Sequence, residues 1–146
     1  MATAAPAQDY ANHKKLVRGF HLVALPILLI NLIYSAFIAV TSFSVDSVIG
    51  VLVAFALILV AFFARIFALG AQDRVIRLEE RMRLHDLLPD QRGEVDKLAT
   101  GQLIALRFAS DGEVGDLVAA VVAEDIGDRE VIKKRVKNWR ADHQRL

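Results

Sequence analysis

The sequence predicts an all-α membrane protein, in which a transmembrane hairpin of two helices is followed by a juxtamembrane helix and a small cytoplasmic helical domain. Two apolar runs of more than twenty residues each fill Phe20–Gly70, and only Ser44–Asp46 interrupts them. A helix needs about 20 apolar residues, at about 1.5 Å each, to cross a hydrocarbon core of about 30 Å. Outside these runs the composition is that of an ordinary soluble helical protein. The predicted segments are a tail (1–19), the hairpin (20–70), the juxtamembrane helix (71–89) and the cytoplasmic domain (90–146).

Charge and cysteine content exclude several classes of function. The net charge is +1, so no overall field attracts nucleic acid, and the chain has no cysteine. A disulfide framework, a thiolate metal site and a thiol nucleophile are therefore excluded. The basic start followed by an apolar run is typical of a signal peptide. However, this run is too long, and no small-x-small cleavage site directly follows it, so we expect the first helix to remain.

Basic residues lie only on one side of the predicted hairpin. Lysine and arginine flank its two ends, whereas the turn carries only Asp46. Because positive residues stay on the cytoplasmic side, we expect both termini in the cytoplasm and the turn in the other compartment. Anionic lipid headgroups are the expected partners of the flanking residues Lys14, Lys15, Arg18, Arg65, Arg74 and Arg77. An ordinary solvated helix face is an equally good interpretation of the arginines after the second run.

Small residues recur along both apolar runs at heptad spacing. In the second run one series is Ser47, Ala54, Ala61 and Ala68, and the interleaved series is Gly50, Leu57, Ala64 and Ala71. The first run has Ala24, Leu28, Asn31, Ser35, Ile38 and Ser42 at the same spacing. Since helices associate in lipid through close packing and hydrogen bonds, we expect two antiparallel seams in contact. The predicted packing residues are Asn31, Ser35, Gly50, Ala54, Ala61, Ala64 and Ala68.

Asn31 is the one amide in the apolar runs. Near the middle of a membrane an unpaired amide is costly. We expect it to form a hydrogen bond between helices or between subunits; a role in transport or ligand binding is the less favoured interpretation.

In the juxtamembrane helix, Val75, Leu78 and Met82 mark one apolar face, and Pro89 ends the helix.

Four short helices are predicted in the cytoplasmic domain. Capping residues place them over 92–98, 102–108, 113–126 and 129–146, with Ser110 and Glu113 at capping-box spacing. Residues 111–130 are acidic and residues 133–145 are basic. Attraction between neighbouring helices explains this best, and lipid or an acidic partner comes second. Trp139 shares a stripe with Ile132 and Val136; we expect it to pack in the core of the domain, and the surface of a partner is the alternative. The candidate docking residues are Trp139, Lys133, Lys134 and Lys137.

The sequence contains no recognisable catalytic, cofactor or metal-binding pattern. The four histidines are scattered without ligand spacing, and no zinc-protease or phosphate-loop motif occurs. Neither a reading motif nor an aromatic platform accompanies the basic residues, so nucleic acid is not expected as a partner. We expect a protein that is not an enzyme and that holds no cofactor or metal.

Three stretches carry a resemblance to a known family: QDYANHKKLVRGFHLVALPILLIN, TGQLIALRFASDGE and IKKRVKNWRADHQRL. With the two apolar runs they resemble a bacterial family of small two-span membrane proteins that is catalogued only as a domain of unknown function. The resemblance implies two spans and a helical cytoplasmic tail, and it brings no activity with it. Some family members are labelled transporter permeases, but this chain has too few spans for one.

Three functions are open at this point. The first is a non-catalytic accessory or scaffold subunit, which docks its cytoplasmic domain on a larger membrane complex; respiratory and photosynthetic complexes are the types to test first. The second is a free-standing membrane-tethered adaptor or regulator. The third is a component of an oligomeric small-solute transporter.

Overall fold

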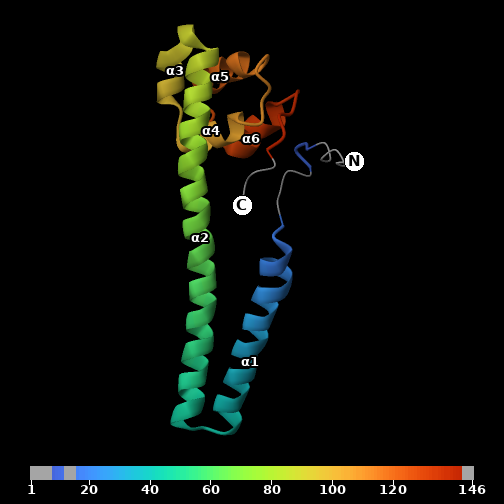
Figure 1. The fold of residues 1–146 in the computed structure, drawn as a ribbon, viewed down its shortest axis with the longest axis vertical. Coiled ribbons are helices and arrows are strands. Elements are labelled where there is room, and N and C mark those ends of the chain that lie inside the picture. Colours follow the sequence, from blue (N-terminus) through green and yellow to red (C-terminus); the bar gives the residue numbers. More distant parts are fainter. Residues whose placement is uncertain (1–7, 12–15, 143–146) are drawn as a thin grey trace, which may run out of the picture. The chain divides into compact units, whose positions relative to one another are not determined.

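The structure, a computed structural model, describes residues 8–11 and 16–142 of the chain, and these are largely helical (Figure 1). Among them the only extended pairing is an isolated bridge between Ala109 and Trp139. Two compact units form, an apolar hairpin (described residues 16–69) and a helical domain (residues 8–11 and 70–142). The helices are η1 (Gly19–Ala24), α1 (Leu25–Thr41), α2 (Val45–Leu87), η2 (Pro89–Gln91), α3 (Arg92–Lys97), α4 (Thr100–Leu106), α5 (Val114–Ala123) and α6 (Arg129–Arg135).

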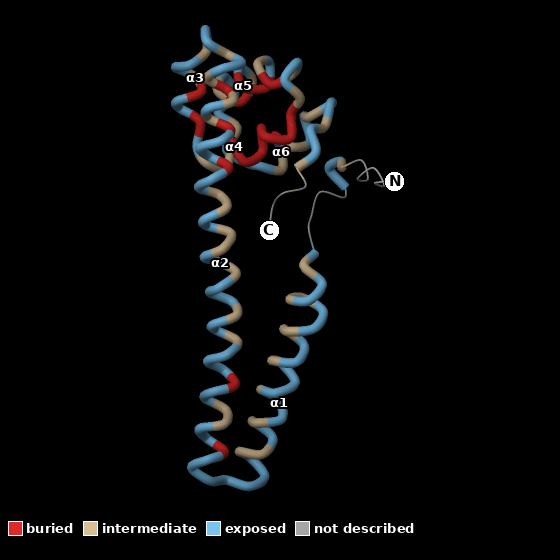
Figure 2. Tube along the Cα trace, viewed as in Figure 1, coloured by how far each residue is buried: buried red, intermediate tan, exposed pale blue. Residues whose placement is uncertain are grey.

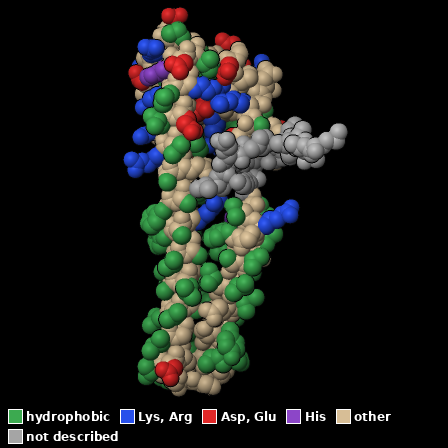
Figure 3. All heavy atoms as spheres, in the orientation of Figure 1, with side chains coloured by type: hydrophobic (Ala, Val, Ile, Leu, Met, Phe, Trp, Pro, Cys, Tyr) green, Lys and Arg blue, Asp and Glu red, His purple; other side chains and the backbone are tan. Residues whose placement is uncertain are grey.

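The hairpin consists of two helices that are long and apolar enough to cross a membrane, Gly19–Thr41 and the first part of Val45–Leu87. Their apolar side chains are exposed along most of their length (Figure 3). The predicted all-α fold with two such helices is therefore confirmed. A reciprocal cap starts α2: the Ser47 backbone N–H donates to Ser44 Oγ at 3.1 Å, and the Ser44 N–H donates to Ser47 Oγ at 2.9 Å. This cap satisfies backbone donors that the first turn of a helix leaves unpaired.

Pro26 explains the π-helical start of the first span. Proline has no N–H, and its ring clashes with the carbonyl group four residues earlier, so an α-helical ladder is interrupted there. In the structure η1 precedes the proline, and the Leu25 N–H donates to the carbonyl oxygen of Phe20. The wider turn accommodates the proline within a continuous span of 23 residues.

The two spans pack through heptad positions, but only one of the predicted series in α2 lies fully on this face. Ser47 and Ala54 are buried, and Ala61 and Ala68 are half-buried. The interleaved half-buried positions are Val51, Ile58 and Arg65, with Gly50 beside them, whereas Leu57, Ala64 and Ala71 are exposed. In α1 the half-buried positions include Leu28, Leu32, Ser35, Ile38 and Ala39, whereas Asn31 and Ser42 are exposed. The predicted positions Ser47, Ala54, Ala61 and Ala68 therefore lie on the less exposed face of α2, whereas Asn31, Leu57 and Ala64 do not lie on the less exposed faces of their helices.

The helical domain is built around one apolar core, visible as the concentration of buried residues in Figure 2. Helices α3, α4, α5 and α6 all contribute to it, and so does the end of α2 through Leu84, with Leu88 packed against the same cluster. Phe108 has the largest fully buried side chain. The residues from Gly70 to Leu87 therefore belong to the domain rather than forming a separate juxtamembrane element.

Val75, Leu78 and Met82, the predicted apolar face of α2, are exposed, and the face that α2 buries in the domain carries Ile76, Glu80 and Leu84. One predicted feature of this domain is wrong. The predicted last helix ends at Arg135, because Val136 adopts extended backbone angles (φ −67°, ψ 122°). Trp139 therefore lies in an extended segment and not on a helical stripe.

Candidate functional site

The C-terminal segment of the domain is held by one acidic side chain, that of Glu113. Its carboxylate accepts backbone N–H groups from Lys137 at 3.1 Å and from Asn138 at 2.9 Å. The same side chain accepts the Ser110 N–H at 3.4 Å, which is the contact expected of a capping box. A backbone hydrogen bond also ties this segment to the α4–α5 loop, because the Arg140 N–H donates to the carbonyl oxygen of Phe108 at 2.7 Å. Glu113 thus fixes an extended segment where the sequence pattern indicates helix.

Trp139 packs inside this domain. Its indole ring stacks on the ring of Phe108, with centroids 4.7 Å apart and planes 22° from parallel. The guanidinium group of Arg107 lies 4.5 Å from the centroid of the Phe108 ring. Arg107 is only 6% exposed, and its Nε lies 3.4 Å from the carboxylate of Asp142. Sequence reasoning missed Arg107, although a charged residue inside the apolar stretch LIALRFA is an unusual feature.

Arg83 and Glu80, two charged residues of α2, join this helix to the α4–α5 loop and to the C-terminal segment. Arg83 donates to Asp111 at 2.5 Å, to Glu80 at 2.8 Å and to the carbonyl oxygen of Ala109 at 2.8 Å. Arg140 pairs with the other oxygen of Glu80 at 3.0 Å. The hydrogen bond and the positive charge of Arg83 lower the pKa of Asp111. We call Glu80, Arg83, Asp111 and Arg140 the charged network.

The N-terminal segment, residues 8–11, contacts the end of the same domain. The Tyr10 hydroxyl donates to Glu130 at 2.9 Å, and this bond raises the pKa of Tyr10. The Gln8 side chain and the Asp142 backbone exchange two hydrogen bonds, of 3.3 Å and 2.8 Å. Lys134 Nζ lies 5.7 Å from the centroid of the Tyr10 ring. The segment before the first span is therefore tied to α6 and to the residues that follow it.

These contacts engage much of the basic cluster that we predicted as a docking surface. Lys133 pairs with Glu130 at 2.8 Å, and its side chain is only 11% exposed. Arg135 forms a bidentate pair with Glu124, at 2.8 Å and 2.7 Å, and lowers the pKa of that carboxylate. The expected attraction between acidic and basic parts is thus present. Of the docking candidates, Lys134 and Lys137 are exposed, whereas Lys133 and Trp139 are half-buried.

The predicted headgroup-contacting residues are not gathered into one site. Lys14 and Lys15 lie outside the described residues, whereas Arg18, Arg74 and Arg77 are exposed and Arg65 is half-buried. Within the described part of the chain, no three His, Cys, Asp or Glu side chains are placed to hold a metal ion. The contacts that the structure shows therefore join segments of this domain to one another.

Comparison with known proteins places the chain in a family. A family model described as a family of unknown function (DUF6526) matches residues 3–146, nearly the whole chain. The chain belongs to this family. The predicted resemblance to a family catalogued as a domain of unknown function is thereby confirmed. Neither the curated proteins nor the solved structures contain a match.

Proposed function

We propose that this member of the DUF6526 family is a non-catalytic accessory or scaffold subunit, which sits in the inner membrane of a bacterium and docks on a larger membrane complex. The observation that carries the proposal is Asn31. It lies near the middle of Gly19–Thr41 and is exposed, on the outside of the hairpin rather than between its helices. Its amide has no hydrogen bond with any residue that the structure describes. In hydrocarbon such a group needs a partner, because leaving an amide unpaired costs several kcal/mol.

The proposed partner therefore presents a polar group within the membrane. Asparagine both donates and accepts hydrogen bonds, and interhelical bonds of this kind stabilise helix pairs by about 1–2 kcal/mol in model peptides. The helical domain supports the same function, since α2 supplies both the second apolar run and the core residue Leu84. A folded domain is thus directly continuous with a candidate membrane anchor.

Substitution of Asn31 tests this function. Asn31→Leu should weaken co-purification of the partner from mild detergent by about tenfold, the effect of losing one hydrogen bond of about 1–2 kcal/mol. Stoichiometric partner chains, identified by mass spectrometry, should accompany the wild-type protein. The matched control is Ile30→Leu, a conservative change at a neighbouring position that is 65% exposed. Recovery of wild-type protein with no other chain would contradict the proposal, and so would equal recovery of partner with Asn31→Leu.

The proposed orientation places both termini in the cytoplasm. The motive is the segregation of lysine and arginine to the two flanks of the hairpin, while the turn between α1 and α2 contains none. Reporters fused to either end of the chain should be active in the cytoplasm, and one inserted beside Asp46 should be active outside the membrane. A reporter at the C-terminus that reads external would contradict this topology and move the helical domain to the other compartment.

A further inference from the structure

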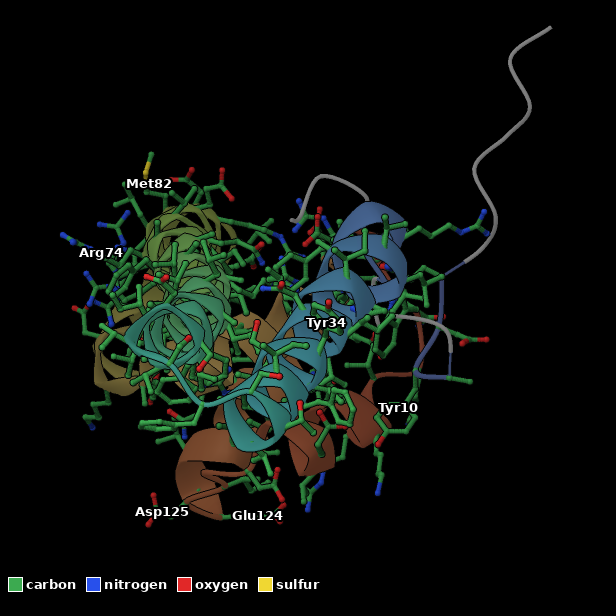
Figure 4. All side chains as sticks on the ribbon, turned by 90° about the horizontal axis from the view of Figure 1, so that it is seen from below. Tyr10, Tyr34, Arg74, Met82, Glu124 and Asp125 are labelled. Carbon is green, nitrogen blue, oxygen red and sulfur yellow. The ribbon has the colours of Figure 1, made fainter. Side chains whose placement is uncertain are left out.

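The exposed apolar face of α2 within the helical domain has no covering element in the described residues. Val75 is 54% exposed, Leu78 is 63% exposed and Met82 is 60% exposed. On a helix with 3.6 residues per turn they lie opposite Ile76 and Glu80, the residues that α2 buries in the domain. Figure 4 shows Met82 and Arg74 pointing outward from α2, away from the side on which α6 lies. We call Ala71, Val75, Leu78 and Met82 the α2 stripe.

We propose that the α2 stripe is the contact surface of a homodimer, in which it pairs in parallel with the same stripe of a second copy of this chain. The stripe has the 4-3-4 spacing of a coiled-coil seam. In heptad notation Val75 and Met82 take position a, and Ala71 and Leu78 take position d. The next d position is His85, which instead contacts Asp96 at 3.0 Å, so the apolar seam ends at Met82.

The charges beside the stripe identify the second copy and its direction. Arg74 and Arg81 take position g, and Glu79 and Asp86 take position e. In a parallel pair, g of one heptad lies beside e of the next heptad on the other helix, so Arg74 meets Glu79 of the second copy. An antiparallel pair would bring g beside g and e beside e, which places like charges together. The charges beside the stripe therefore attract one another only when two copies of α2 run parallel.

The charged groups at the start of this seam are available for such pairs. Arg74 and Glu79 are exposed, and neither forms an ion pair within the described structure. Arg81 is partly engaged, because its Nη2 donates to the carbonyl oxygen of Leu98 at 3.2 Å. The pair between Arg74 and Glu79 is consequently the one to test.

Lipid is a poorer cover for the stripe than a second helix. Met82 follows Leu69, the last apolar residue of the second run, by 13 residues of continuous helix, which correspond to about 20 Å of rise. The headgroup region on one side of a bilayer is only about 5–8 Å thick. Acyl chains therefore do not reach the end of the stripe when α2 runs steeply through the membrane.

A seam this short is sufficient for a membrane-anchored pair. Two heptads form only a marginally stable coiled coil when the peptides are free, because association must then also offset the unfavourable free energy of forming each helix. Here the helix already exists as part of α2. Anchoring both copies in one membrane also raises their effective concentration. The parallel direction follows from the proposed topology as well, so this part of the inference rests on the proposed function.

Cysteine crosslinking of the full-length chain in native membranes tests the homodimer. The protein has no cysteine of its own, so single-cysteine variants have no background. Leu78→Cys, oxidised with copper phenanthroline, should give several-fold more disulfide dimer than Arg77→Cys, since only position d brings the two Cα atoms within disulfide range. Arg77 is the matched control because it is exposed and lies on another side of α2. Equal dimer yields from the two variants would overturn the proposal.

Exchanging the charges of Arg74 and Glu79 distinguishes specific pairing of two copies from crosslinking by random collision in the membrane. In the Leu78→Cys background, Arg74→Glu or Glu79→Arg alone should lower the dimer yield, and the two together should restore it. Failure of the double exchange to restore the yield would overturn the assignment of the seam. Because the readout contains only this chain, its result is independent of the Asn31 experiment. A dimer without a partner complex contradicts the proposed function alone, and a complex without this dimer contradicts the further inference alone.

Discussion

Trp139→Ala should lower the free energy of unfolding of the helical domain by about 3 kcal/mol, the low end of the range for loss of a large aromatic core residue. The low end applies because Trp139 is half-buried, although its ring stacks on the fully buried Phe108. Pulse proteolysis of the full chain in mild detergent and increasing urea measures this, since cleavage within 90–142 reports unfolding of the domain alone.

Two controls identify the role of Trp139. Trp139→Phe should keep most of the stability because it preserves an aromatic stack, and Lys137→Ala should change it by no more than about 0.5 kcal/mol, as is usual for an exposed position. If Trp139→Ala instead left the urea midpoint unchanged and abolished co-purification of the partner, the residue would be a docking anchor.

The two long apolar helices could be predicted because each run holds more than twenty largely apolar residues in succession. Their rotation about the helix axis was harder to predict. With 3.6 residues per turn, positions three or four residues from a seam residue both lie near the seam. In a soluble helix polar residues would decide between them, but both faces of a membrane span are apolar. Ile58 was therefore as good a candidate as Leu57, and the structure half-buries Ile58.

The domain shows what local patterns leave out. α2 buries Glu80 and exposes Leu78, the reverse of the usual preference, because Glu80 pairs with a residue distant in sequence as well as with Arg83 on the same helix. Arg140 is one of these partners, and no local spacing connects the two. The end of α6 is similar: Lys137 and Asn138 have no strong helix-breaking signal, but Glu113 captures their N–H groups. Tertiary hydrogen bonds override helix propensity there.

The charged network leads to the second large effect. Arg83→Ala should destabilise the domain by about 3 kcal/mol, because removing one partner leaves a buried charge poorly compensated. The Glu80 side chain is only 7% exposed, and its remaining partner would be Arg140, whose side chain is 50% exposed. Urea titration with pulse proteolysis measures the change. The double variant with Glu80→Gln should be less destabilised than the sum of the single variants, since it removes the uncompensated charge. Additive effects would contradict the coupling of Glu80 to Arg83.

Acid titration provides an independent signature of the same network. Arg83 lowers the pKa of Asp111 in the folded protein, so the folded state binds this proton less readily than the unfolded state does. The stabilisation from Asp111 is complete above its unfolded pKa of about 4 and is lost as pH falls through the lower folded pKa. In Arg83→Ala the pKa of Asp111 returns toward its ordinary value. Below about pH 4, wild-type stability should therefore fall more steeply than that of Arg83→Ala, and equal slopes would show that this ion pair contributes nothing to the folded state.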